Sequence, residues 1–179
     1  IIDGGGTGPV VTIVASGTSF SGFTVRNAGT NPAASASIGL MDVTNCTIQG
    51  NTTSDNLFGI ALQNADTNTI RENTISGSGL YGIYVGYNAN GASTGNTIDD
   101  NTITASGLDG IYLDKDSHSN SVINNDILNT VGGLNVDGYP EGNGIYLWKA
   151  ASATITGNTI SGNARYGIEM MGSANNTIT

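Results

Sequence analysis

Charged residues are scarce in this chain of 179 amino acids, and basic residues are the scarcest of them. Only 11% of the residues are charged, and 5 Lys and Arg stand against 14 Asp and Glu, which leaves a formal net charge of −9 at pH 7. Nucleic acids and anionic membrane surfaces are bound through clusters of Lys and Arg. The composition therefore predicts that nucleic acid is not a partner.

Long apolar runs, cysteine pairs and a recognisable signal peptide are also missing. No run approaches the roughly 18 apolar residues that a membrane-spanning helix needs, so we expect no insertion into a membrane. Cys46 is the only cysteine and cannot form an internal disulfide. The cysteine content therefore says little about the compartment.

What the chain does contain is a repeated phrase, Asn-Thr-Ile-x-x-Asn-Thr-Ile, found at 68–75 and 96–103 with looser copies elsewhere. A second phrase, Gly-Ile-x-Leu, lies between these copies. It begins at Gly59, Gly82, Gly110, Gly144 and Gly167. Both phrases alternate apolar and polar residues over a few positions, which is the period of a short strand with one buried face.

Repeats of about 22 residues cannot bury their apolar side alone, but stacked repeats can. We therefore predict an all-β solenoid, a parallel β-helix of about seven coils with short strands. The apolar positions of successive coils would form three inward columns, ending at Ile178, Ile160 and Met170. Asparagines would stack as a ladder at a turn, because a side-chain amide both donates and accepts: Asn73, Asn101, Asn125 and Asn158.

The two phrases together resemble the repeats of right-handed parallel β-helix proteins of the pectate-lyase-like superfamily. That group includes NosD-like, carbohydrate-binding and sugar-hydrolase repeat proteins. The resemblance covers nearly the whole chain and implies the fold. It does not select an activity, since the superfamily contains polysaccharide lyases, glycoside hydrolases, mannuronan epimerases, phage tailspikes and non-catalytic surface proteins.

Departures from the repeat indicate where a site would lie. The residue between Ile and Leu of the second phrase points outward, and in the middle coils aromatic and basic residues gather there and just beyond. Two insertions, 87–95 and 128–143, flank this strip and would wall a groove. Aromatic faces beside polar groups suit a sugar chain. The predicted polysaccharide-binding residues are Tyr84, Tyr87, Tyr112, Tyr146, Trp148 and Lys149. Cross-strand stacking of the tyrosines is the alternative explanation of the column.

Four residues after the third groove strand are candidates for catalysis: Asp114, Lys115, Asp116 and His118. Asp116-Ser117-His118 resembles the Asp-Pro-His element of mannuronan epimerases, with the proline replaced. Such a set would abstract the proton alpha to a uronate carboxylate and return it. A lone histidine in a polar turn is more commonly a turn residue, so the sequence leaves open whether the protein is an enzyme.

Hydrolase and lyase chemistry stay open as well. A glycoside hydrolase needs two facing carboxyls. Asp114 with one of Asp109, Asp116, Asp137 or Glu141 would supply them, but nothing in the sequence marks a pair. No cofactor is evident. Asp114 and Asp116 with loop carboxylates would suit Ca²⁺, although no EF-hand-like spacing is present and the metal ligands are undetermined.

We expect residues 1–179 to form a single β-helix domain that is a segment of a longer solenoid without its caps. End-to-end self-association is the alternative. The sequence favours an extracellular or cell-surface module that binds, or also modifies, a polysaccharide along an exposed aromatic groove. The alternative is a structural or adhesive solenoid with no sugar ligand.

Overall fold

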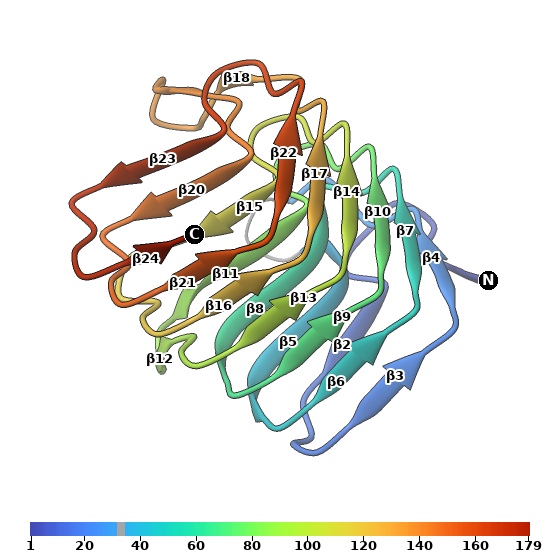
Figure 1. The fold of residues 1–179 in the computed structure, drawn as a ribbon. Coiled ribbons are helices and arrows are strands. Elements are labelled where there is room, and N and C mark those ends of the chain that lie inside the picture. Colours follow the sequence, from blue (N-terminus) through green and yellow to red (C-terminus); the bar gives the residue numbers. More distant parts are fainter. Residues whose placement is uncertain (32–34) are drawn as a thin grey trace.

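A computed structural model describes residues 1–31 and 35–179 and confirms a right-handed parallel β-helix of about seven coils. Each coil contributes one strand to each of three parallel sheets, and the sheets wrap around a common core (Figure 1). None of the described residues forms a helix long and apolar enough to cross a membrane.

The strands are short, as the repeat predicts. Sheet A consists of β1 (Ile2–Asp3), β4 (Thr24–Arg26), β7 (Thr52–Ser54), β10 (Thr74–Ser76), β14 (Thr102–Thr104), β17 (Asp126–Leu128) and β22 (Thr159–Ser161). Sheet B consists of β2 (Val11–Ile13), β5 (Ala36–Thr44), β8 (Phe58–Asp66), β11 (Ile83–Asn88), β15 (Ile111–Leu113), β20 (Ile145–Trp148) and β23 (Ile168–Met171), with β12 (Gly91–Ala92) paired to β11. Sheet C consists of β3 (Ser19–Ser21), β6 (Thr47–Gln49), β9 (Thr69–Arg71), β13 (Thr97–Asp99), β16 (Ser121–Ile123), β21 (Thr154–Thr156) and β24 (Thr177–Ile178). A separate hairpin joins β18 (Gly133–Leu134) to β19 (Pro140–Glu141).

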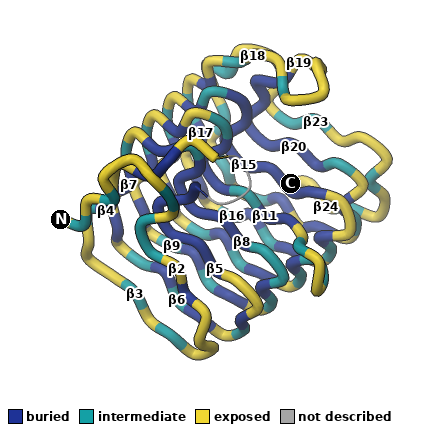
Figure 2. Tube along the Cα trace, turned by 180° about the vertical axis from the view of Figure 1, so that it is seen from behind, coloured by how far each residue is buried: buried dark blue, intermediate teal, exposed yellow. Residues whose placement is uncertain are grey.

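The core runs along the axis of the solenoid, and its side chains form the three predicted inward columns. In β13, for example, Ile98 pairs with Ile70 and Val122 of the neighbouring coils, and all three are fully buried. In the last coil the columns end on exposed side chains, since Met170 is 46% and Ile178 is 44% exposed. Figure 2 shows the buried strands in the interior and the exposed residues at the turns and on the β18–β19 hairpin.

Buried asparagines stack at two corners of the solenoid. The predicted ladder is present, because Asn73, Asn101 and Asn125 each donate from Nδ2 to the Oδ1 of the next asparagine at 2.9–3.0 Å. A second ladder, from Asn68 through Asn96 to Asn120, lies at the corner between sheets B and C. Each rung also satisfies backbone groups that the sharp turn would otherwise leave unpaired.

The glycine of the Gly-Ile-x-Leu phrase has a steric cause in four of its five copies. A Cβ on Gly110 would lie 2.3 Å from Cγ2 of Ile127 and 2.7 Å from the carbonyl oxygen of Gly144 in the next coil. Gly59, Gly82 and Gly144 meet the same two obstacles. The glycine therefore allows the start of sheet B to approach both the core isoleucine and the adjacent coil.

Candidate functional site

A column of tyrosines lies in register on the outer face of sheet B. Tyr84 in β11 pairs with Tyr112 in β15, and Tyr112 pairs with Tyr146 in β20. Ala61 precedes them and Glu169 follows, in the predicted order. The ring centroids are 5.8 Å apart for Tyr84 and Tyr112 and 5.2 Å apart for Tyr112 and Tyr146.

These tyrosines are less accessible than an exposed strip would be. Tyr112 is 9% and Tyr146 is 8% exposed, because they belong to a second apolar cluster outside the solenoid core. Phe58 at the start of β8 completes this cluster, together with Tyr81 and Leu108 from the turns before β11 and β15. Cross-strand stacking therefore accounts for part of the column, and the buried tyrosines form a floor.

Above this floor the surface is hollowed. One groove segment of about 530 Å³ extends along sheet B from the first coils to Asp114 and Trp148. A second segment of about 310 Å³ continues toward the last coils. Both segments include Tyr112, Glu141 and Trp148, so the two form one path along the solenoid.

The two insertions predicted to wall a groove lie at opposite edges of sheet B. The insertion at 87–95 follows β11 and folds into the β11–β12 pair, from which Tyr87 lines the first segment. The longer insertion at 128–143 precedes β20 and carries the β18–β19 hairpin, whose Asn135 and Asp137 line both segments. In Figure 1 this hairpin projects from the edge of the sheet near β20 and β23.

Asp114 is held firmly in the first segment. Its carboxylate accepts hydrogen bonds from the Tyr84 hydroxyl, from the Tyr112 hydroxyl at 3.3 Å and from the Lys115 backbone N–H at 2.6 Å. Gly86 makes this arrangement possible, since a Cβ there would lie 2.1 Å from the Tyr84 ring. The predicted groove residue Asp114 therefore has a defined position between two tyrosines.

A second carboxylate lies where the two groove segments meet. Glu141 is 5% exposed, and its carboxylate accepts hydrogen bonds from the Tyr81 hydroxyl at 3.0 Å and from Asn135 Nδ2 at 2.7 Å. Burial raises the pKa of Glu141, although its hydrogen bonds oppose the shift. Asp109 lies behind it, fully buried. Sequence reasoning named both acids without pairing them and missed Tyr81, whose only signal is its place before Gly82.

The tyrosine hydroxyls of the cluster act as donors. Burial first, and neighbouring carboxylates second, raise the pKa of Tyr81, Tyr84 and Tyr112 far above the ordinary value. The same burial, with the charge of Glu169, raises the pKa of Tyr146 to about 12. These hydroxyls therefore stay protonated and offer hydrogen bonds to carboxylates or ligand oxygens.

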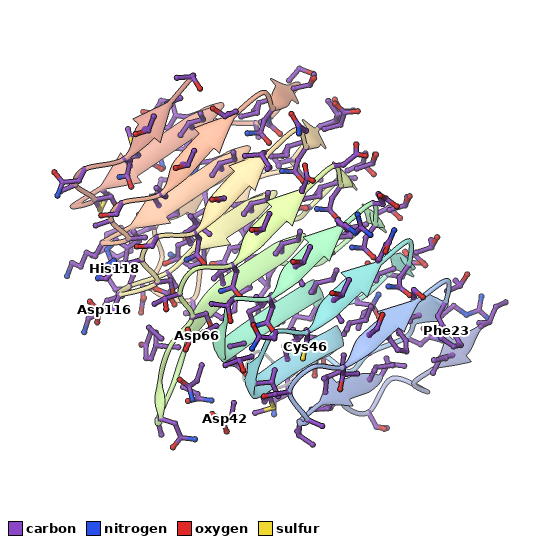
Figure 3. All side chains as sticks on the ribbon, turned by 60° about the horizontal axis from the view of Figure 1, so that its bottom comes forward. Phe23, Asp42, Cys46, Asp66, Asp116 and His118 are labelled. Carbon is purple, nitrogen blue, oxygen red and sulfur yellow. The ribbon has the colours of Figure 1, made fainter. Side chains whose placement is uncertain are left out.

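The remaining predicted residues lie outside both groove segments of the described structure. Lys115 forms an exposed ion pair with Asp116, with Nζ and Oδ2 3.8 Å apart. His118 lies in the turn beyond them, where its Nδ1 accepts a hydrogen bond from the Ala151 backbone N–H at 3.0 Å. Figure 3 shows Asp116 and His118 side by side at one edge of the solenoid.

Lys149 is exposed beside the groove, with its Nζ 5.0 Å from the centre of the Trp148 ring. Trp148 itself is half-buried and packs against the aromatic cluster. This contact is a cation–π pair that places one positive charge at the rim of the groove.

A family model described as "Periplasmic copper-binding protein (NosD)" matches residues 10–141 and 136–179. The chain belongs to the NosD family. A comparison with curated proteins gave no match.

Solved structures similar to this NosD-family chain share its fold at low sequence identity. A mutant of the periplasmic alginate epimerase AlgG is 22% identical with a TM-score of 0.67, and the match covers 86% of this chain and 33% of that one. PfbA, a surface adhesin of Streptococcus pneumoniae, is 16% identical with a TM-score of 0.63 over 84% of this chain and 40% of that one. The A-module of the Azotobacter vinelandii mannuronan C-5 epimerase AlgE6 is 14% identical with a TM-score of 0.63 over 97% and 54%. The chain thus spans about a third to a half of the length of these three proteins.

The histidine and the cysteine of the described structure do not fit the copper of the family's name. Copper is bound by imidazole, thiolate and thioether groups held together. His118 Nδ1 is engaged with the backbone, and Cys46 is 1% exposed. Within 1–31 and 35–179, no group of three or more His, Cys, Asp and Glu side chains could hold a metal ion. Calcium bound through Asp114, Asp116 and loop carboxylates remains a prediction.

Proposed function

We propose that this chain is a module that binds a polysaccharide lengthwise along the outer face of sheet B. The observation that carries the proposal is the groove, which runs past several coils over an aromatic floor and is walled by both long insertions. A path along the solenoid axis suits an extended polymer, because each coil presents a new set of side chains to the next stretch of chain.

The lining provides what a sugar polymer needs. Tyr84 and Trp148 are half-buried and Tyr87 is 49% exposed, so their rings remain available to the apolar faces of sugars. Asp114, Asn135 and Asp137 supply hydrogen-bonding groups for hydroxyls beside those rings. The net charge of −9 and the acidic lining favour an uncharged polymer over a polyanion, unless Ca²⁺ bridges the two.

The module acts outside the cytoplasm, in the periplasm or at the cell surface. Support comes from the family description, which names a periplasmic protein, and from the similar structures, which include a periplasmic alginate epimerase and a surface adhesin. The two similar epimerases, one of alginate and one of mannuronan, also support a polysaccharide as the ligand class.

A glycan array with and without Ca²⁺ tests the proposal. The wild-type chain is compared with Trp148→Ala and Tyr87→Ala, and with Phe23→Ala as a matched aromatic control at another corner of the solenoid, where Phe23 stacks on Phe20. We expect at least one polysaccharide to bind and each groove variant to bind it about tenfold more weakly, which corresponds to about 1.4 kcal/mol. An equal loss of polysaccharide binding in Phe23→Ala and in the groove variants would contradict a binding site on sheet B.

The second candidate is a structural or adhesive solenoid with no sugar ligand. The burial of Tyr112 and Tyr146 favours it, because stacked tyrosines stabilise adjacent strands without any ligand. If no glycan binds, and if substitution of these two buried tyrosines lowers only the stability of the fold, the structural function replaces the binding function.

A further inference from the structure

Asp109 and Glu141 interact at the base of the groove, and polysaccharide binding alone makes no use of the two carboxyl groups. Asp109 Oδ1 accepts three hydrogen bonds, from Gly142 N at 3.1 Å, Asn143 N at 2.7 Å and Asn143 Nδ2 at 3.0 Å. Its other oxygen, Oδ2, is buried and receives no hydrogen bond from any donor among the described residues. An orphaned carboxylate oxygen is costly in the interior unless it carries or shares a proton.

Glu141 is the partner with which such a proton is shared. Burial raises its pKa, while hydrogen bonds from Asn135, Tyr81 and Asp109 oppose that shift. Two carboxyl groups hydrogen-bond to each other only when one proton lies between them. Burial, together with the nearby Glu141, also raises the pKa of Asp109 to about 7, against the three hydrogen bonds on Oδ1. The pair therefore retains a proton near neutral pH, and its Glu141 member lines the groove.

Asp114 lines the same groove in a different environment. It accepts three hydrogen bonds, from the Tyr84 and Tyr112 hydroxyls and from the Lys115 backbone N–H. The two acids are joined through the aromatic floor, since the ring of Tyr112 lies 4.8 Å from the ring of Tyr81, and Tyr81 donates to Glu141. Asp114 and Glu141 thus line the same groove segment, and glycoside hydrolysis uses two carboxyl groups, one as proton donor and one as proton acceptor.

We propose that the groove hydrolyses the polysaccharide that it binds, with Glu141 as the general acid and Asp114 as the general base. The proposal rests on the proposed binding function. Glu141 gives its proton to the glycosidic oxygen as the bond from that oxygen to the anomeric carbon breaks. A water molecule forms the new bond to the anomeric carbon and gives its proton to Asp114. One water is consumed for each bond cleaved, and the proton on Asp114 returns through solvent to the carboxyl pair.

Asp109 is a positioning residue in this scheme, because it touches Glu141 and not the groove. The substrate class is an uncharged polysaccharide cleaved within the chain, since groove segments extend on both sides of Glu141. Trp148 and Tyr112 also line both segments, so sugar units on either side of the cleaved bond would contact the aromatic floor and its rim.

The experiment measures reducing ends released from mixed-linkage β-glucan, galactomannan, arabinoxylan and alginate, alongside binding of the same polymers. We expect release from an uncharged polymer, and a loss of release of about 10²–10⁴-fold in Glu141→Gln and in Asp114→Asn, with binding retained in Glu141→Gln. Asp109→Asn should shift the basic limb of the pH–rate profile to lower pH, because Glu141 no longer shares its proton. Asp126→Asn, an exposed position on sheet A, is the control that should leave activity unchanged.

Each outcome decides between the two proposals. A polymer that binds but is not cleaved, or is cleaved equally by Glu141→Gln, overturns hydrolysis and leaves the binding function intact. Products with an unsaturated end would show elimination and also overturn it. If no polymer binds and none is cleaved, both proposals fail.

Discussion

At the scale of single residues, the most informative are buried polar side chains that have an atom without a hydrogen-bond partner among the described residues. Asp109 is such a case, and its environment makes folding stability depend on pH. Its pKa rises from 3.8 to about 7 through burial. An acid with a raised pKa in the folded state holds its proton more tightly there than in the unfolded chain. The stability that protonated Asp109 contributes is therefore fully present below its pKa in the unfolded chain, and it is lost as the pH rises through about 7.

Asp109→Asn should remove this dependence. The asparagine Oδ1 can accept the same three hydrogen bonds, and its amide can donate to Glu141 without titrating. Chemical denaturation between pH 4 and pH 8 should show that the wild-type chain loses more stability with rising pH than the variant, by about 1.4 kcal/mol for each pKa unit of the shift. Parallel profiles for the two proteins would show that Asp109 is not protonated in the fold.

Thr53 is a second polar residue in an apolar place. It is fully buried in the sheet A column between Val25 and Ile75, and its hydroxyl has no hydrogen-bond partner among the described residues. Thr53→Val keeps the shape and removes the unsatisfied group, so it should raise the free energy of unfolding by about 1 kcal/mol. Thr74→Val, at an exposed position of the next coil, is the control for β-propensity alone. A less stable Thr53→Val would mean that the hydroxyl is satisfied.

At the scale of the elements, the close approach of successive coils is the constraint that the repeat encodes. Gly110→Ala would place a methyl group against Ile127 and against the backbone of Gly144. We expect a loss of about 1–3 kcal/mol in thermal or denaturant unfolding, as for other overpacked cores. Gly8→Ala, where a Cβ meets nothing within 4 Å, should be nearly neutral. Similar losses at both positions would point to general backbone effects instead of coil contact.

How much the sequence predicts also differs between elements. The inward columns, the asparagine ladder at 73–158 and the tyrosine register follow from period and spacing, which are local properties of each repeat. The burial of Tyr112 was not predicted, because it depends on how Tyr81 and Leu108 fold from the preceding turns over the outer face of sheet B, and the alternation within each strand does not specify this. The pairing of Asp109 with Glu141 was not predicted for a related reason. Asp109 belongs to the turn before β15, whereas Glu141 belongs to the 128–143 insertion, and no repeat places that insertion in space.

At the scale of the whole molecule, the coils are unequal. Those that contain β11, β15 and β20 carry the tyrosine floor, the rim tryptophan and both wall insertions, while sheets A and C repeat a simpler pattern of Thr and Ile. A regular solenoid would need none of these departures to be stable. The central claim is therefore that sheet B of these coils is a binding surface for an extended sugar polymer.

The intrinsic fluorescence of Trp148 measures this claim most directly. Trp148 is the only tryptophan in the sequence, it is half-buried and it lines both groove segments, so its emission reports on the groove alone. Titration with the polysaccharides above should give a saturable change in emission for at least one polymer. That change should be weakened in Tyr84→Ala and kept in Phe23→Ala. A polymer that binds by an independent assay without altering Trp148 emission, or no response to any of them, would contradict the claim.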